Sequence, residues 1–119
     1  MKIIFLLAFI SFSLISPAQI PKSGTYIYKY CDLEYHECIS TCKVVIRGNH
    51  ITIYATKELA QHINSFKQGD IIDKGIILKH KSGEWIIGKS RKDINANEIG
   101  GCSDGPREID FKRKRFWTC

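Results

Sequence analysis

Four consecutive cations beside aromatic residues form the part of this sequence best suited to bind a ligand. This basic run consists of Lys112, Arg113, Lys114 and Arg115, and it lies between Phe111 and Phe116-Trp117. Cations interleaved with aromatic rings are typical of surfaces that bind polyanions. The sequence therefore predicts that the basic run and Trp117 bind an anionic glycan, lipid or protein, whereas a nucleic acid is not expected for an exported chain. The alternative is that these charges keep an exposed edge strand from pairing with other chains.

Residues 101–105 match the G-x-S-x-G pattern of a hydrolase nucleophile, with Ser103 at its centre. That chemistry needs the serine on a sharp turn between a strand and a helix, close to a histidine and an acid. Here Pro106 and an expected strand follow, and the chain is too short for the large sheet of an α/β-hydrolase. We interpret the motif as a Gly-rich turn. Because no catalytic group has a convincing partner, the sequence predicts a binding module rather than an enzyme.

One stretch has the ligand spacing of an EF-hand calcium loop. Oxygen ligands occupy its positions 1, 3, 5 and 12, at Asp93, Asn95, Asn97 and Asp104. Glu98 stands where the sharp turn needs Gly, and position 12 lacks the bidentate Glu. The stretch is therefore interpreted as a polar loop or helix cap.

A second candidate metal set is His36, Cys38 and Cys42, whose side chains would suit zinc or copper. Cysteines of exported proteins more often form disulfides, so we expect no metal and no cofactor. The carboxylates of Asp32, Glu34 and Glu37 lie close to this set in sequence. They are interpreted as part of a solvated loop, since a glycosidase needs two carboxylates at a defined separation across a sugar cleft.

The first 18 residues are typical of a secretory signal peptide. Lys2 precedes an apolar run at residues 3–15, and the small residues Ser16 and Ala18 precede Gln19. A membrane span would need about 20 apolar residues. The sequence therefore predicts a signal peptide at residues 1–18, a single β-rich domain at residues 19–119, no stable membrane span, and a secreted or periplasmic location.

Five cysteines lie after this segment, so an oxidising compartment implies two disulfides and one free thiol. The number of cysteines alone does not determine which of them are paired. Cys31 ends one expected strand and Cys42 begins the next, which favours a Cys31–Cys42 bridge. The second predicted bridge joins Cys38 to Cys119 and leaves Cys102 free. A Cys102–Cys119 bridge would require the single strand expected over residues 107–117 to bend.

The elements expected around these residues are mostly strands. Alternation over residues 25–31 places Tyr26, Tyr28 and Tyr30 on one face, which is half of a core, a cross-strand ladder or a surface that stacks on sugars. Residues 42–47 and 50–55 form a hairpin through Gly48-Asn49. A helix over residues 56–66 begins at Thr56. Further strands are expected at residues 76–80, 85–89 and 107–117.

These elements predict a mainly β fold, a small antiparallel β-barrel or sandwich of about six or seven strands with one covering helix at about residues 56–66. Gly24-x-Tyr26 ahead of a strand meander resembles lipocalin-like proteins, and residues 69–85 are similar in texture to SH3-like barrels. Neither stretch carries a diagnostic motif. The first resemblance implies a carrier for a small apolar ligand, which would need a cavity inside the barrel.

Length and charge limit the classes of function that the chain can have. The chain has 119 residues with 18 Lys+Arg and 12 Asp+Glu, which is room for one domain and excludes a multidomain enzyme. Lys2 is the only charged residue among the first 18, so its removal leaves 17 cations and a formal charge of +5. The sequence therefore predicts an exported, disulfide-stabilised β domain that binds an anionic envelope component or a partner protein. The alternatives are the apolar-ligand carrier and an inhibitor of a secreted hydrolase, although a basic inhibitor would be repelled by a basic enzyme such as lysozyme.

Overall fold

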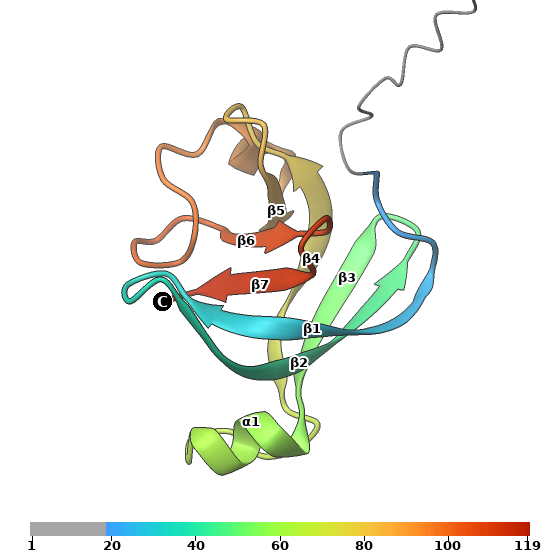
Figure 1. The fold of residues 1–119 in the computed structure, drawn as a ribbon. Coiled ribbons are helices and arrows are strands. Elements are labelled where there is room, and N and C mark those ends of the chain that lie inside the picture. Colours follow the sequence, from blue (N-terminus) through green and yellow to red (C-terminus); the bar gives the residue numbers. More distant parts are fainter. Residues whose placement is uncertain (1–18) are drawn as a thin grey trace, which may run out of the picture.

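The computed structural model describes residues 19–119, so the predicted signal peptide lies outside the described residues. These residues fold into a closed seven-stranded β-barrel (Figure 1). In chain order the elements are β1 (Gly24–Asp32), β2 (Glu37–Arg47), β3 (His50–Ala55), α1 (Lys57–His62), β4 (Ile71–Lys79), β5 (Trp85–Gly88), the 3-10 helix η1 (Arg91–Asn95), β6 (Arg107–Asp110) and β7 (Arg115–Thr118). The prediction of a mainly β fold with one α-helix is confirmed. Within residues 19–119, no helix has the length and apolar character needed to span a membrane.

Each strand pairs with the next in antiparallel fashion, and β1 closes the barrel by pairing with β7 in parallel. The parallel pair follows from the number of strands, because the first and seventh strands of a meander run in the same direction. Closure leaves β7 paired on both sides. The basic run therefore does not protect an exposed edge strand, and that alternative is wrong.

Inward-facing side chains from every strand fill the barrel. The aromatic face of β1 points inward as a core face, with Tyr28 2% exposed and its ring against Phe111. Tyr30 is also buried and packs against Phe116. Tyr28 and Tyr30 are therefore core residues, and the sugar-stacking interpretation is wrong for both. A register shift between Tyr30 and Cys31 buries two successive residues of β1.

The helix is shorter than predicted, since α1 ends at His62 rather than near residue 66. Thr56 is the expected N-cap, and its hydroxyl accepts a hydrogen bond from the Leu59 N–H at 3.1 Å. Leu59 is buried in the core, while Ile63 and Phe66 pack against it from the loop that follows. Leu59, Ile63 and Phe66 therefore face the core as a helix over residues 56–66 would place them, although the helix itself is shorter. Figure 1 shows α1 in the connection between β3 and β4.

The largest local difference from prediction is at residues 107–117. These residues form a hairpin, β6 and β7, joined by a turn at residues 111–114. The Asp110 carboxylate accepts a hydrogen bond from the Arg113 N–H at 2.9 Å, and Lys114 has a φ of 57°. The turn contains no Gly or Pro, so its local signal in the sequence is confined to Asp110, whose carboxylate hydrogen-bonds the turn backbone.

The disulfide pairing differs from both predicted bridges. Cys31 is bonded to Cys38 and Cys102 to Cys119, while Cys42 is free and buried. Cys31 lies opposite Cys38 in the β1–β2 register, whereas Cys42 lies opposite Tyr28. The turn between β6 and β7 supplies the bend that a Cys102–Cys119 bridge requires. Two disulfides are typical of an oxidising compartment such as the periplasm or the cell exterior.

Candidate functional site

The basic run forms the tip of the β6–β7 hairpin. Lys112, Arg113 and Lys114 are exposed, and Arg115 is the half-buried first residue of β7. The carbonyl of Lys114 accepts a hydrogen bond from the Lys29 N–H at 2.9 Å, which fixes the turn to the neighbouring strand. Lys29 is also the register partner of Arg115, so a fifth cation adjoins the run.

These cations are not paired with carboxylates in the part of the chain that the structure describes. The ion pairs found there join Asp73 to Lys89 and to Arg107. Trp117 is half-buried and lies two residues beyond Arg115, hence on the same outer face of β7. The predicted binding residues therefore lie together at the turn and in β7, and the three exposed cations Lys112, Arg113 and Lys114 are accessible to an anion.

An ion-pair cluster around the buried carboxylate of Asp73 was not predicted from the sequence. The side chain of Asp73 is 4% exposed, with Lys89 Nζ at 2.5 Å and the Arg107 guanidinium at 3.5 Å. Arg107 Nε also donates to the Thr118 hydroxyl at 2.7 Å. The available signal was that Asp73 shares its strand face with Ile77, since residues two and four apart in a strand point the same way. These contacts neutralise the buried carboxylate.

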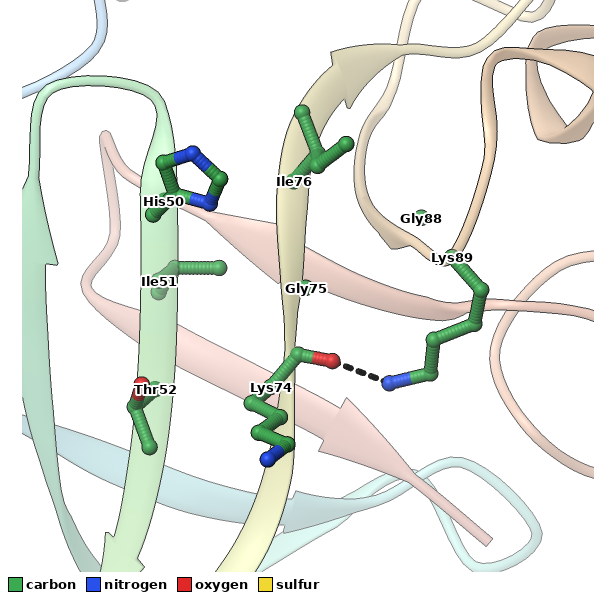
Figure 2. Close-up of a pocket in the computed structure, with 8 residues that line it drawn as sticks. All are labelled: His50, Ile51, Thr52, Lys74, Gly75, Ile76, Gly88 and Lys89. Carbon is green, nitrogen blue, oxygen red and sulfur yellow. Dashed lines mark hydrogen bonds between the residues drawn. The ribbon is translucent and has the colours of Figure 1, made fainter.

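A hollow of about 270 Å³ lies on the barrel where β3, β4 and β5 meet. Figure 2 shows His50 and Thr52 on β3, Lys74 and Ile76 on β4, and Lys89 reaching towards the backbone carbonyl of Lys74. Gly75 and Gly88 complete the lining together with Ile51. The lining is therefore cationic, with two lysines, a histidine and no carboxylate.

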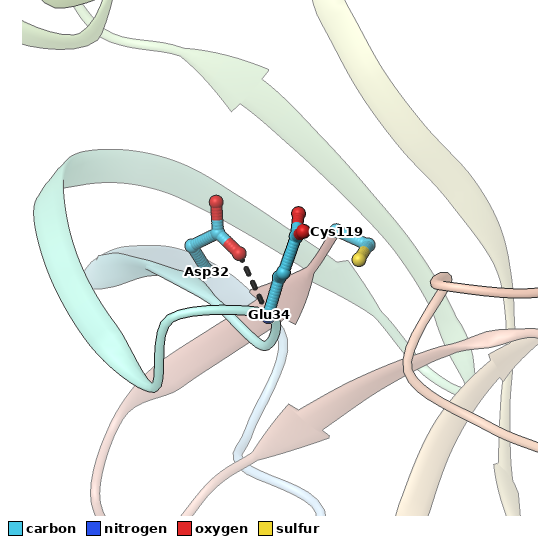
Figure 3. A group of neighbouring side chains, drawn as sticks. All are labelled: Asp32, Glu34 and Cys119. Atoms are coloured by element: carbon cyan, nitrogen blue, oxygen red, sulfur yellow. Dashed lines mark hydrogen bonds between the residues drawn. The ribbon is translucent and has the colours of Figure 1, made fainter.

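A second group, Asp32, Glu34 and Cys119, brings ligand-type atoms within 4.8 Å of one another (Figure 3). The Sγ of Cys119 is bonded to Cys102, so it is not a thiolate. The Asp32 carboxylate accepts a hydrogen bond from the Glu34 N–H at 2.8 Å, which shapes the loop between β1 and β2. The arrangement supplies two exposed or half-exposed carboxylates at the base of that loop and no soft ligand.

The sulfur atoms of the candidate zinc set, Cys38 and Cys42, are not available together. Cys38 is in a disulfide, and Cys42 lies inside the barrel. Burial raises the pKa of the Cys42 thiol to about 12, which disfavours the thiolate that metals bind.

The calcium-type stretch begins in η1. The Asp93 carboxylate accepts a hydrogen bond from the Lys89 N–H at 2.7 Å, so it fixes the backbone that enters the helix. Ser103 lies in the exposed loop before β6, and Pro106 and a strand follow it as expected. The structure therefore does not place Ser103 on a strand-to-helix nucleophile turn.

Two glutamates, Glu84 and Glu108, form a hydrogen-bonded pair beside β6. Burial, followed by the hydrogen bond with Glu84 and the charges of Glu84 and Asp110, raises the pKa of Glu108 from 4.5 to about 7. A carboxyl group whose folded-state pKa is raised stabilises the fold below its unfolded pKa, and this contribution is lost as pH rises through the folded value.

The stability of the parent protein is therefore expected to fall as pH rises from about 4.5 to about 7, and Glu108→Gln should abolish this fall. Glutamine keeps a hydrogen-bond donor for Glu84 and does not ionise. The measurement is the difference in Tm between the variant and the parent across this range. The difference should grow in favour of the variant as pH rises. Glu58→Gln, on exposed α1, provides the control. A Glu108→Gln difference that stays constant with pH would contradict the prediction.

Comparison of the chain with models of protein families, with curated proteins and with solved structures finds no match. The function is therefore argued from the chain's own residues.

Proposed function

We propose that the mature chain is a secreted or periplasmic, non-enzymatic binding module for an anionic component of the cell envelope. The observation that carries the proposal is the hairpin tip, where Lys112, Arg113 and Lys114 are exposed with no ion pair to a carboxylate of residues 19–119. Bonding of the turn to β1 and β6 holds these cations in one place. Less conformational entropy is then lost when an anion binds.

The structure offers less support for an apolar-ligand carrier. A carrier needs space inside the barrel, and this barrel's interior is occupied by core side chains such as Ile53, Ile87 and Phe116. The two disulfides support the exported location in this proposal, because disulfides stabilise small domains outside the cytoplasm.

Binding to immobilised heparin tests the proposal, with heparin as a general polyanion. The triple variant Lys112→Gln, Arg113→Gln, Lys114→Gln is expected to weaken binding about tenfold, since exposed ionic contacts contribute about 0.2–1 kcal/mol each. The matched control removes three charges from other exposed positions, as Lys57→Gln, Lys67→Gln, Lys81→Gln. We expect the control to retain most of the affinity.

Equal weakening in the two variants would show that only net charge matters, and it would refute a specific role for the hairpin tip. Unchanged retention of the hairpin variant would refute it as well. A Trp117→Ala variant that loses affinity at high salt would show that the ring contributes beyond charge, since salt screens the cations but not the stacking.

A further inference from the structure

We propose that the hollow between β3, β4 and β5 binds a phosphate group carried on a small polyol or sugar. This inference goes beyond the proposed function, because it assigns a second anionic ligand to the protein and names its chemical group. It uses a surface different from the basic run.

Two glycines, Gly75 and Gly88, lie in the lining of the hollow. A Cβ at Gly75 would lie 2.2 Å from the Gly88 carbonyl oxygen, and a Cβ at Gly88 would lie 2.5 Å from Leu78 Cδ1. Both distances are too short for any other residue without movement of the backbone or of Leu78. Close packing of β4 on β5 therefore requires glycine at position 75, and neither glycine contributes a side chain to the lining of the hollow.

The two lysines beside the hollow still have N–H donors for a ligand. Lys89 Nζ contacts the Asp73 carboxylate at 2.5 Å and donates to the Lys74 carbonyl. An ammonium group has three N–H donors, so one remains for a ligand. Lys74 is exposed, and the ion pairs of residues 19–119 do not include its side chain.

Polar groups also come from the facing strand. Thr52 is the register partner of Lys74, and His50 is the partner of Ile76. Directly paired residues have Cβ atoms about 4.5–5.5 Å apart, so the Thr52 hydroxyl and the Lys74 stem flank the same space. Donors from two strands and from Lys89 thus surround the hollow on different sides, which suits the several acceptor oxygens of a phosphate.

The size of the hollow indicates more than a bare anion. Its volume of about 270 Å³ is close to the lower end of the range of about 300–1,000 Å³ found for ligand pockets. Ile76 is half-buried and supplies an apolar side. A phosphate held by the lysines with a carbon skeleton against Ile76 would use both features. The Asp73 carboxylate contacts Lys89. This contact orients the Lys89 side chain and partly offsets the positive potential of its ammonium group.

The test is titration of the ¹⁵N-labelled, disulfide-bonded mature chain with inorganic phosphate and then with glycerol 1-phosphate, at constant ionic strength maintained by chloride. We expect saturable amide shifts at the hollow, at His50, Thr52, Lys74, Gly75, Gly88 and Lys89. Glycerol 1-phosphate should bind more tightly than phosphate. Lys74→Gln should raise the Kd about tenfold, whereas Lys81→Gln, which removes an exposed lysine elsewhere, should leave it unchanged.

The source of the phosphate is distinguished with vesicles. Lys74-dependent binding to phosphatidylglycerol–phosphatidylcholine vesicles, but not to pure phosphatidylcholine vesicles, would assign the group to a lipid headgroup. Binding of glycerol 1-phosphate without vesicle binding would assign it to a free phosphorylated compound. Either result supports the proposal.

Shifts that do not saturate, or that chloride alone reproduces, would overturn it. Shifts confined to residues 112–115 would also overturn it while leaving the proposed function intact. Conversely, phosphate binding at the hollow combined with unchanged heparin retention of the hairpin variant would refute the role of the basic run alone. Amide shifts far from residue 74 should match those of the parent, which verifies that Lys74→Gln is folded.

Discussion

Removing the Cys102–Cys119 bridge by a double serine substitution is expected to lower the free energy of unfolding by about 3 kcal/mol. This bridge closes a sequence separation of 17 residues, whereas Cys31–Cys38 closes one of 7. A cross-link reduces the entropy of the unfolded chain more when its loop is longer, so serine substitution of Cys31 and Cys38 should cost only about 2 kcal/mol. Urea denaturation followed by circular dichroism measures both losses.

The pairing itself is tested by mass spectrometry without reductant. The folded protein should resist alkylation, because the Cys42 thiol is buried. The denatured protein should take up one alkyl group, located at Cys42 in a peptide map. A map that contained Cys31–Cys42 or Cys38–Cys119 would contradict the structure. A larger stability loss from the shorter loop would contradict the entropic reason.

Gly75→Ala is expected to destabilise the fold by about 1–3 kcal/mol or more, as overpacking of a tight site does. The pairing of β4 with β5 begins next to this point, since Gly75 pairs with Ile51 of β3 and Ile76 pairs with both His50 of β3 and Gly88 of β5. The added Cβ would lie 2.2 Å from the Gly88 carbonyl oxygen, and a backbone atom of a paired strand cannot move as a side chain can. The strands would have to separate.

The matched control is Gly24→Ala in β1. A Cβ there would meet only the Tyr26 ring, at 3.6 Å or more, which is ordinary van der Waals contact. Denaturation midpoints of the two variants and the parent give the comparison. Equal midpoints for Gly75→Ala and Gly24→Ala would show that the contact at Gly75 does not limit stability.

Local patterns in the sequence determined several elements correctly. The Gly48-Asn49 hairpin and the Thr56 cap depend on residues a few positions apart, and both are present. Alternation in β1 identified its tyrosine-bearing face, because side chains of a strand point to opposite sides in turn. The basic run was identified from its composition alone.

Features that depend on distant residues were decided only by the tertiary structure. The turn at residues 111–114 lacks Gly and Pro, and it forms where β7 must run back beside both β6 and β1. That turn makes the basic run a hairpin tip, and it brings Cys119 within bonding distance of Cys102. The hollow with Lys74 and Lys89 likewise arises where three strands meet. Such juxtapositions follow from barrel closure, which is set by packing of the whole core and leaves no short-range signal in the sequence.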